Sequence, residues 1–379
     1  MTDQPRRQWS TSQWAIKVVQ VAAGIGLAVL LLWWGLPLLT HTSWDRIVEH
    51  LARLPASTAL FGVLLMFGGL YCYTFTMAAS LPGLSHGQAL MVNLIGSGVS
   101  NAMPGGGAVG AAAQYGVFRS WGFGHRSIST SILVAAIWNF LIRLLMPLVA
   151  VLWLLAGSDG RLPPVAVRGA LIGGVAAAAL SVIVAAVLIS PSVAHFIGHA
   201  INRVASPVLR MMGRTHTRDV EALAADVRAR MVDVVRGGWP GLTLGLVGFL
   251  GTYAFLYWVC MRAFGIDLGP DKAFACYALS RLLTLIPLTP GGIGTTEVGP
   301  AALMVAMGAH GTSAAAAVFL FAVYSHLLEI PFGALAGAAW VRTRGHYARR
   351  RALEGNPDES NSDEDNPEEG ARSEGQVSD

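Results

Sequence analysis

The 379-residue sequence contains little charge: only 13% of its residues are Asp, Glu, Lys or Arg, whereas 54% are hydrophobic. A soluble domain carries about a quarter charged residues, so the composition argues against that class and against a disordered regulator. Cysteine is also scarce, with three residues in the chain and no metal-ligand spacing. This argues against a disulfide framework or a cysteine metal site, and a helical membrane protein is the class that fits.

Long apolar runs occur throughout the chain, and a bilayer core requires about 20 apolar residues per helix. Six runs of this kind predict transmembrane helices, namely Val18–Leu39, Thr58–Ser80, Ser131–Ala156, Val165–Ile189, Leu242–Phe264 and about Ala314–Val341. The first run is too long for a signal peptide and lacks a small-residue cleavage site. We therefore expect it to remain as a membrane span.

Two further apolar regions are each interrupted by a proline followed by two glycines. Their halves are Ala89–Met103 and Gly107–Arg119 in the first region, and Ala273–Pro287 and Ile293–Gly308 in the second. Each half is too short to cross a bilayer comfortably, and Pro followed by Gly breaks a helix. Broken backbone inside a membrane requires protein or a water-filled cavity around it. We predict two re-entrant helical hairpins, each entering and leaving on one side.

The sequence also contains an internal repeat. One constant shift, which we call the repeat offset, aligns Pro104-Gly105-Gly106 with Pro290-Gly291-Gly292 and Arg143 with Glu329 without a gap. The repeats cover about residues 58–156 and 242–341, and each contains a long helix, a broken hairpin and a second long helix. The single span between them makes the second repeat inverted. We therefore predict an all-α polytopic membrane protein with inverted-topology repeats, about six long spans and two hairpins, as in many secondary transporters.

The distribution of arginines predicts the orientation of the chain. With the N-terminus in the cytoplasm, the outside loops contain only Arg46, Arg53, Arg161 and Lys272, whereas the cytoplasmic segments contain most of the arginines. This matches the positive-inside rule, so both termini are expected in the cytoplasm.

The net charge of +4 divides into a basic body and an acidic end, because the segment from Glu354 onward carries −9. We expect residues 1–14 to be a cytoplasmic N-terminus, 15–343 the transmembrane domain and 344–379 a disordered acidic tail. Between the repeats, about residues 193–238 form a cytoplasmic connection. Its apolar stripe predicts an amphipathic helix that rests on lipid headgroups or binds a partner.

Four ionisable residues lie within apolar segments, where charge is costly and indicates a functional site by default. They are Arg143, Arg281, Glu297 and Glu329. Two interpretations remain open. In one, the four form two ion pairs that hold the repeats together. In the other, the arginines present guanidinium groups to a phosphate-bearing substrate, and the glutamates act as counter-charges or proton carriers.

The second-half motif Arg281-x5-Pro287-x2-Pro290-Gly291-Gly292-x-Gly294-x2-Glu297 closely resembles the signature of the lysylphosphatidylglycerol synthase transmembrane region, a flippase-like family. The first-half motif Asn101-x2-Pro104-Gly105-Gly106, followed by Gly122 and Arg143, is similar to its counterpart. The resemblance covers about residues 15–340 and implies a bacterial cytoplasmic-membrane protein with a lipid-translocating fold. In full-length synthases a soluble aminoacyl-transferase domain follows the membrane part. This chain has only a short acidic tail there, so we do not expect synthase activity.

Together these observations favour a lipid flippase-like transporter of a phosphate-bearing lipid, with no catalytic residues, metal, cofactor or nucleic-acid partner expected. The expected substrate-binding residues are the four ionisable residues together with Asn101, Pro104, Gly105, Gly106, Pro290, Gly291, Gly292 and Gly294. Two alternatives stay open: a membrane-embedded transferase acting on a polyprenyl-phosphate lipid, and a non-catalytic scaffold for a separate enzyme. A homo-oligomer or a soluble cytoplasmic partner is compatible with each.

Overall fold

The computed structural model describes residues 33–34, 36–103, 106–157, 218–284 and 294–354, with a few isolated positions between 172 and 183. Within these residues the secondary structure is helical and contains no strand. Most of the predicted spans Val18–Leu39 and Val165–Ile189 lies outside the described residues. Three further segments lie wholly outside the described residues, namely residues 1–32, residues 355–379 and the predicted cytoplasmic connection up to residue 217.

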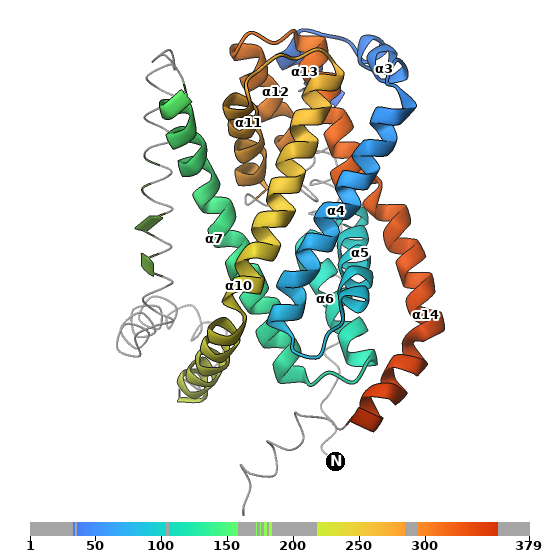
Figure 1. The fold of residues 1–379 in the computed structure, drawn as a ribbon, viewed down its shortest axis with the longest axis vertical. Coiled ribbons are helices and arrows are strands. Elements are labelled where there is room, and N and C mark those ends of the chain that lie inside the picture. Colours follow the sequence, from blue (N-terminus) through green and yellow to red (C-terminus); the bar gives the residue numbers. More distant parts are fainter. Residues whose placement is uncertain are drawn as a thin grey trace, which may run out of the picture.

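Four of the helical segments are long and apolar enough to cross a membrane. They are α4 (Ala56–Ser80), α7 (His125–Gly157), the apolar part of α10 (Arg218–Ala263), and a run formed by α13 (Gly311–Ala322), η3 (Val323–Leu327) and α14 (Glu329–Glu354). These four correspond to four of the six predicted spans. They run along the long axis of the molecule (Figure 1).

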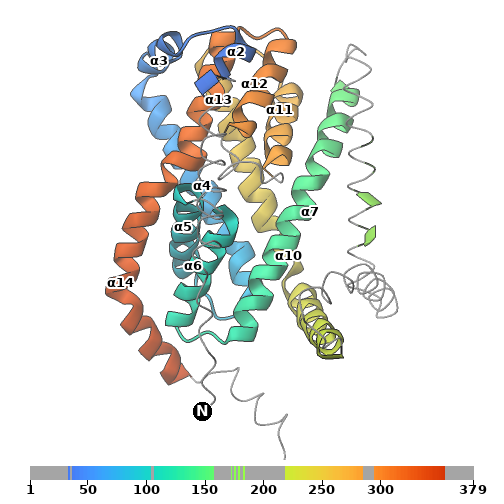
Figure 2. The same cartoon turned by 180° about the vertical axis from the view of Figure 1, so that it is seen from behind.

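Two pairs of shorter helices lie between the long ones. The pairs are α5 (His86–Ala102) with α6 (Gly106–Ser120), and α11 (Pro270–Leu283) with α12 (Thr295–Ala306). A capping box between Ser85 and Gln88 starts α5. Figures 1 and 2 show α5 and α6 in the lower half of the molecule and α11 and α12 in the upper half. The two pairs therefore join their neighbouring long helices at opposite ends.

Helix ends recur at the repeat offset found in the sequence. Helix α7 begins at His125, and α13 begins at the equivalent position, Gly311. The turns before them contain Gly122 and Gly308, whose φ angles of 84° and 98° favour glycine. We call α4 to α7 the first half of the molecule and α10 to α14 the second half.

Equivalent aromatic residues also make equivalent contacts in the two halves. Trp138 Nε1 donates a hydrogen bond of 3.1 Å to Thr243 Oγ1, near the start of the apolar part of α10. Its counterpart at the repeat offset, Tyr324, donates one of 3.0 Å to the carbonyl of Ala59 near the start of α4. Each half thus places an aromatic side chain of its second long helix against the first long helix of the other half.

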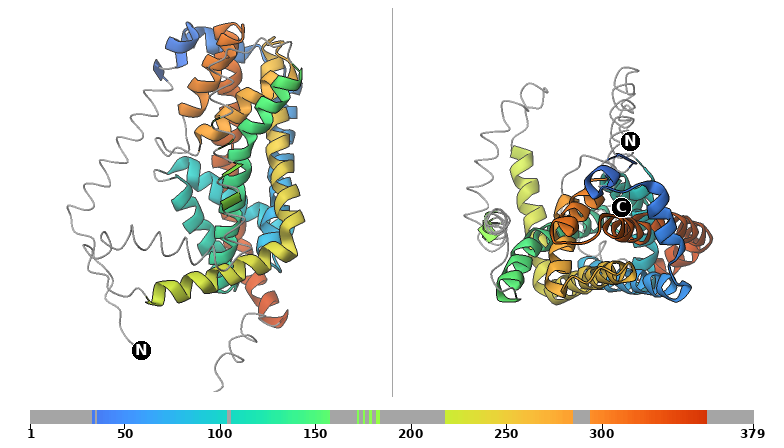
Figure 3. Two further views of the ribbon diagram at one scale, coloured as in Figure 1. Left: turned by 90° about the vertical axis from the view of Figure 1, so that its left-hand side faces the viewer. Right: turned by 90° about the horizontal axis from the view of Figure 1, so that it is seen from above.

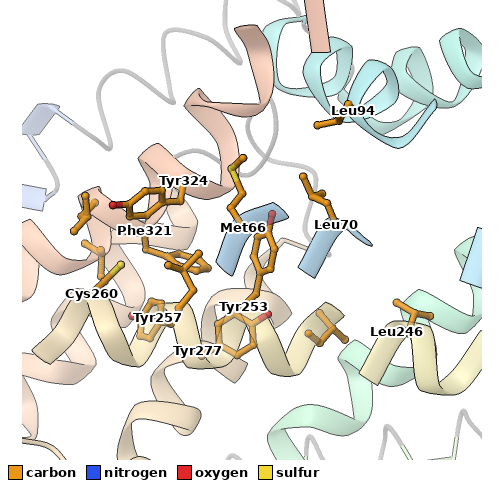
Figure 4. Close-up of a cluster of buried hydrophobic side chains, with 14 of the residues drawn as sticks. Met66, Leu70, Leu94, Leu246, Tyr253, Tyr257, Cys260, Tyr277, Phe321 and Tyr324 are labelled. Carbon is orange, nitrogen blue, oxygen red and sulfur yellow. The ribbon is translucent and has the colours of Figure 1, made fainter. Parts of the chain in front are cut away.

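An aromatic cluster lies where α4, α10, α11 and α13 meet (Figure 4). The ring of Phe321 packs edge-on against Tyr257, Tyr277 and Tyr253, at centroid distances of 4.9, 6.0 and 6.2 Å. Such T-shaped pairs add specific geometry to the burial of large apolar surface. On the other side of Tyr253, a Cβ atom at Gly69 would approach its ring to 2.7 Å, so this glycine permits the close packing of α4 on α10.

The boundaries of two helices, α10 and α14, differ from those predicted from the sequence. Residues 218–238, the described part of the predicted connection, are helical and continuous with α10, and this part bends away from the long axis (Figure 3). Pro240 lies inside α10, and proline is a common cause of such a bend. Helix α14 continues to Glu354, so the tail predicted from residue 344 begins within a helix. Its Arg and Ala residues have good helix propensity.

Candidate functional site

The four ionisable residues are largely withdrawn from solvent. Arg281, Glu297 and Glu329 are 5%, 2% and 6% exposed, and Arg143 is partly buried. Among the residues that the structure describes, no carboxylate lies within 4 Å of either arginine. The interpretation of the four residues as two ion pairs is therefore wrong for the described chain, because each side chain finds other partners.

Arg281 lies in the last turn of α11, against two aromatic rings. Its Cζ atom is 5.3 Å from the ring centroids of both Tyr277 and Phe321. A long contact of 3.5 Å joins its Nη2 to Ser280 Oγ, and its Nε has no hydrogen-bond partner in the described structure. Aromatic faces attract a cation without neutralising it. Arg281 is thus a buried positive charge with donor capacity to spare.

Arg143 approaches Arg281 from the neighbouring helix α7. Its Nη1 donates a hydrogen bond of 2.8 Å to the Oγ1 of Thr284, directly after α11, and its Nε is also unpaired within the described residues. Arg143 interacts electrostatically with Arg281, Tyr277 and Tyr73. Two guanidinium groups that repel one another and keep free N–H groups form an arrangement that a bound anion stabilises.

Glu329 is the first residue of α14 and connects three elements. Its Oε1 accepts a hydrogen bond of 3.1 Å from the Tyr253 hydroxyl on α10, and its Oε2 accepts one of 2.9 Å from Asn101 Nδ2 on α5. The same Asn101 amide reaches the carbonyl of His326 at 3.3 Å. The carboxylate therefore joins α14 to α5 and α10 through neutral donors.

A close helix crossing and a π-helical turn bring Glu329 to Asn101. A Cβ atom at Gly98 of α5 would lie 2.9 Å from the Glu329 carbonyl oxygen and 3.0 Å from Gly333 Cα, so the two backbones touch at this glycine. Just before Glu329, the backbone N–H of Leu328 bonds the carbonyl of Val323 at 2.8 Å, five residues back. Single π-turns inside α-helices are frequent at functional sites.

Glu297 has a local role at the start of α12. Its Oε2 accepts a hydrogen bond of 2.5 Å from the backbone N–H of Gly294, and its Oε1 accepts one of 2.8 Å from Thr296 Oγ1. Gly294 has a φ of 93°, which explains why glycine is needed at this predicted site position. A carboxylate in the first turn also gains from the helix dipole. Glu297 thus caps its own helix.

A comparison with known families identifies the family of the chain. A family model described as the lysylphosphatidylglycerol synthase TM region matches residues 21–333. The chain belongs to this family. A search of curated proteins found no match. The match includes all four ionisable residues, and family membership together with the long apolar helices makes the chain a multi-pass membrane protein.

Within this family match, the structure describes some of the predicted site residues and not others. Gly106 is the first residue of α6, has a φ of 38° and accepts a hydrogen bond of 3.1 Å from Ser100 Oγ through its carbonyl. Five other predicted site residues lie outside the described residues, namely Pro104, Gly105, Pro290, Gly291 and Gly292. Of the predicted set, the structure places Asn101 against Glu329 and Arg143 near Arg281.

Sequence reasoning missed the neutral residues around the charges. They are Tyr73, Tyr253, Tyr277, Thr284 and Phe321. An aromatic residue in an apolar run is usually a core residue, so its type carries no signal. A usable signal existed for Tyr277 alone, since it lies one helical turn before Arg281 on the same helix face.

Proposed function

We propose that this chain is a lipid flippase-like transporter that moves a phosphate-bearing lipid between the leaflets of a bacterial cell membrane. The observation that carries the proposal is the approach of Arg143 to Arg281, since Arg143 bonds Thr284 at 2.8 Å, one helical turn after Arg281. Each arginine has an unpaired Nε–H and no carboxylate within 4 Å in the described structure. Guanidinium groups suit phosphate oxygens through planar, bidentate hydrogen bonding. Membership of a membrane family supports a lipid as the carrier of that phosphate.

The proposed architecture is a pair of inverted repeats. In it, α5–α6 and α11–α12 are re-entrant hairpins that enter the membrane from opposite sides, with both chain termini in the cytoplasm. The recurrence of helix ends at the repeat offset and the placement of the two pairs in opposite halves support this interpretation. Transporters of this design bind substrates near the midplane, where the repeats meet.

The two arginines belong to different halves, and this suggests how binding acts on the fold. An anion held by both Arg143 and Arg281 joins α7 of the first half to α11 of the second half. It offsets the repulsion between the two cations, so it favours the arrangement in which they are close. A ligand that binds one arrangement better shifts the population toward it.

Reconstitution into liposomes tests the proposal. The movement of a fluorescent phosphatidylglycerol between leaflets is followed with a membrane-impermeant quencher. We expect Arg281→Ala and Arg143→Ala to slow protein-dependent movement about tenfold or more, since each removes a charged hydrogen-bonding group. Arg262→Ala is the matched control, because Arg262 is exposed and pairs with Asp267 at the surface.

Two results would count against the proposal. If Arg281→Ala and Arg143→Ala move lipid as fast as the parent protein, the arginines are not the site. If the purified parent instead converts a polyprenyl-phosphate lipid into a new product, the transferase function replaces the transporter.

A further inference from the structure

Glu329 and Glu297 are both buried carboxylates, but their charges are compensated differently. Glu297 receives a backbone N–H and the positive end of its own helix. Glu329 receives neutral side-chain donors from Asn101 and Tyr253, while no cation lies within 4 Å of it among the described residues. Arg281 acts at a distance on both carboxylates, but Glu329 lacks the backbone N–H donor that Glu297 has, so Glu329 depends more on that distant charge.

The distant charge that Glu329 depends on is Arg281. The guanidinium of Arg281 lies against the ring of Phe321, which packs edge-on against Tyr253, and the Tyr253 hydroxyl donates to Glu329. One aromatic layer therefore separates the two charges, and Arg281 lowers the cost of the negative charge on Glu329. In a low-dielectric interior such interactions act over longer distances than in water. An anion bound at Arg281 offsets this positive charge and adds a negative one nearby. Burial then favours the neutral form of the carboxyl group.

We propose that Glu329 takes up a proton when an anionic lipid headgroup binds beside Arg281, so that anion and proton are bound together. This inference rests on the proposed function, because it requires the anion site at Arg143 and Arg281. It adds a coupling ion to that function. Movement of the bound complex across the membrane would carry a proton with each lipid, so a transmembrane proton gradient would bias the direction of lipid movement.

The hydrogen-bond network around Glu329 can accept this proton without losing its contacts. Asn101 Nδ2 can only donate, so it continues to donate to Oε2. The proton is placed on Oε1, which then donates to the Tyr253 hydroxyl oxygen, and this hydroxyl changes from donor to acceptor. The joint between α14, α5 and α10 is thereby retained in both protonation states.

Apart from Glu297, which also interacts with Arg281, the groups near Glu329 leave few other candidates for the proton. Tyr253 comes from α10, Arg281 from α11 and the neutral Asn101 and Ser97 from α5. His326 comes from η3, and its Nδ1 forms a hydrogen bond of 2.8 Å with Ser325 Oγ. Helices α4 and α13 contain no charged residue. Helix α6 meets α14 further along the chain, through the hydrogen bond from Trp340 to Ser120.

Titration calorimetry of the detergent-solubilised full chain tests the inference. The probe is dihexanoyl phosphatidylglycerol, whose phosphodiester keeps one negative charge near neutral pH, so any proton taken up goes to the protein. Binding heats measured in two buffers of different ionisation enthalpy give the number of protons. In the pH range where Glu329 titrates, we expect the uptake of about one proton per bound probe. In the same range, the affinity for the probe should fall up to about tenfold for each unit by which the pH rises.

Three variants identify the group that takes up the proton. Glu329→Gln should bind the probe without proton uptake, and His326→Gln should retain the uptake. Tyr253→Phe removes one donor to the ionised carboxylate, so it should move the uptake to higher pH even if Glu329→Gln does not fold. The inference is wrong if the parent binds the probe without a proton, if uptake persists in Glu329→Gln, or if it disappears in His326→Gln.

The outcome also separates this inference from the proposed function. Binding that requires Arg281 but takes up no proton contradicts the inference and leaves the proposed function in place. A parent protein that does not bind the probe, or that binds it equally well after Arg281→Ala, contradicts the anion site and the inference with it.

Discussion

The two halves of the molecule place opposite charges at equivalent positions. Arg143 of α7 and Glu329 of α14 are related by the repeat offset, and each forms a hydrogen bond with the end of the first short helix of the other half. Arg143 does so through Thr284 after α11, and Glu329 through Asn101 near the end of α5. The two halves therefore make equivalent contacts with each other, but the contact of the first half uses a positive charge and that of the second half a negative charge.

The second half also carries the remaining buried charges. The positions equivalent to Arg281 and Glu297 are Ile95 and Ala111 in the first half, and Ile95 is a buried apolar residue. The chain between α13 and α14 contains a π-turn, whereas α7 continues as an α-helix through Arg143. The halves thus share their scaffold, and the ionic features of the site belong mainly to the second half, with Arg143 as the contribution of the first.

The helix crossings at these joints offer the largest expected effect on stability. Gly98→Leu places a side chain against the Glu329 carbonyl and Gly333, so we expect a loss of about 3 kcal/mol or more. The matched substitution at the equivalent position of the second half is Thr284→Leu, where a side chain is already present. Thermal unfolding in detergent should show a much larger decrease in Tm for Gly98→Leu, and equal decreases would contradict the difference between the crossings.

Reversing the charge at the shared position gives the next largest effect. Arg143→Glu brings a carboxylate toward Arg281 and competes with an anionic substrate, so we expect lipid movement to fall about a hundredfold. Arg143→Lys keeps the charge but loses the planar guanidinium, and a loss of about tenfold is expected. The liposome assay measures both. If lipid moved faster with Arg143→Glu than with Arg143→Lys, the positive charge at this position would have no role in lipid movement.

Loss of the amide at Asn101 should have a moderate effect. Asn101→Ala removes its hydrogen bonds to the Glu329 carboxylate and the His326 carbonyl, and it leaves buried acceptors unsatisfied. We expect destabilisation of about 1–3 kcal/mol. Thr284→Ala, which removes the corresponding contact of Arg143, should cost less, because Arg143 is less buried. Chemical unfolding of both variants checks the order, and the reverse order would contradict it.

The smallest effect is expected at the helix cap. Glu297→Gln keeps an acceptor for the Gly294 N–H but loses the charge at the start of α12, so we expect a change of about 1 kcal/mol or less. Glu297→Ala loses both and should cost about 1–2 kcal/mol. The difference in Tm between the two variants measures the cap. Equal effects would show that Glu297 acts through its charge alone.

Much of this scaffold could be predicted from the sequence. The length of each apolar run predicted α4, α7, the apolar part of α10 and the run from Gly311, because the length of a span follows from the thickness of a bilayer. The glycines at positions 122 and 308, which the repeat offset relates, lie in the turns before α7 and α13 and have a positive φ. The repeat offset also identified Arg143 and Glu329 as equivalent.

The partners of the charged residues could not be predicted in the same way. The two ion pairs of one open interpretation are not found in the described structure, because Arg281 lies against aromatic rings and Glu297 turns back to its own backbone. Both contacts depend on side-chain direction and helix crossing rather than on residue type. The π-turn before Glu329 has no sequence signal that we could identify, although it determines the helix face on which Glu329 lies.

The most direct test of this account is a double-mutant cycle on the binding of dihexanoyl phosphatidylglycerol. Affinities are measured for the parent, Arg143→Ala, Arg281→Ala and the double variant. If both arginines hold the same phosphate, each single change weakens binding and the double change costs less than their sum, with a coupling of about 1–3 kcal/mol. Strictly additive losses, or single variants that bind as tightly as the parent, would contradict a shared anion site between the two halves.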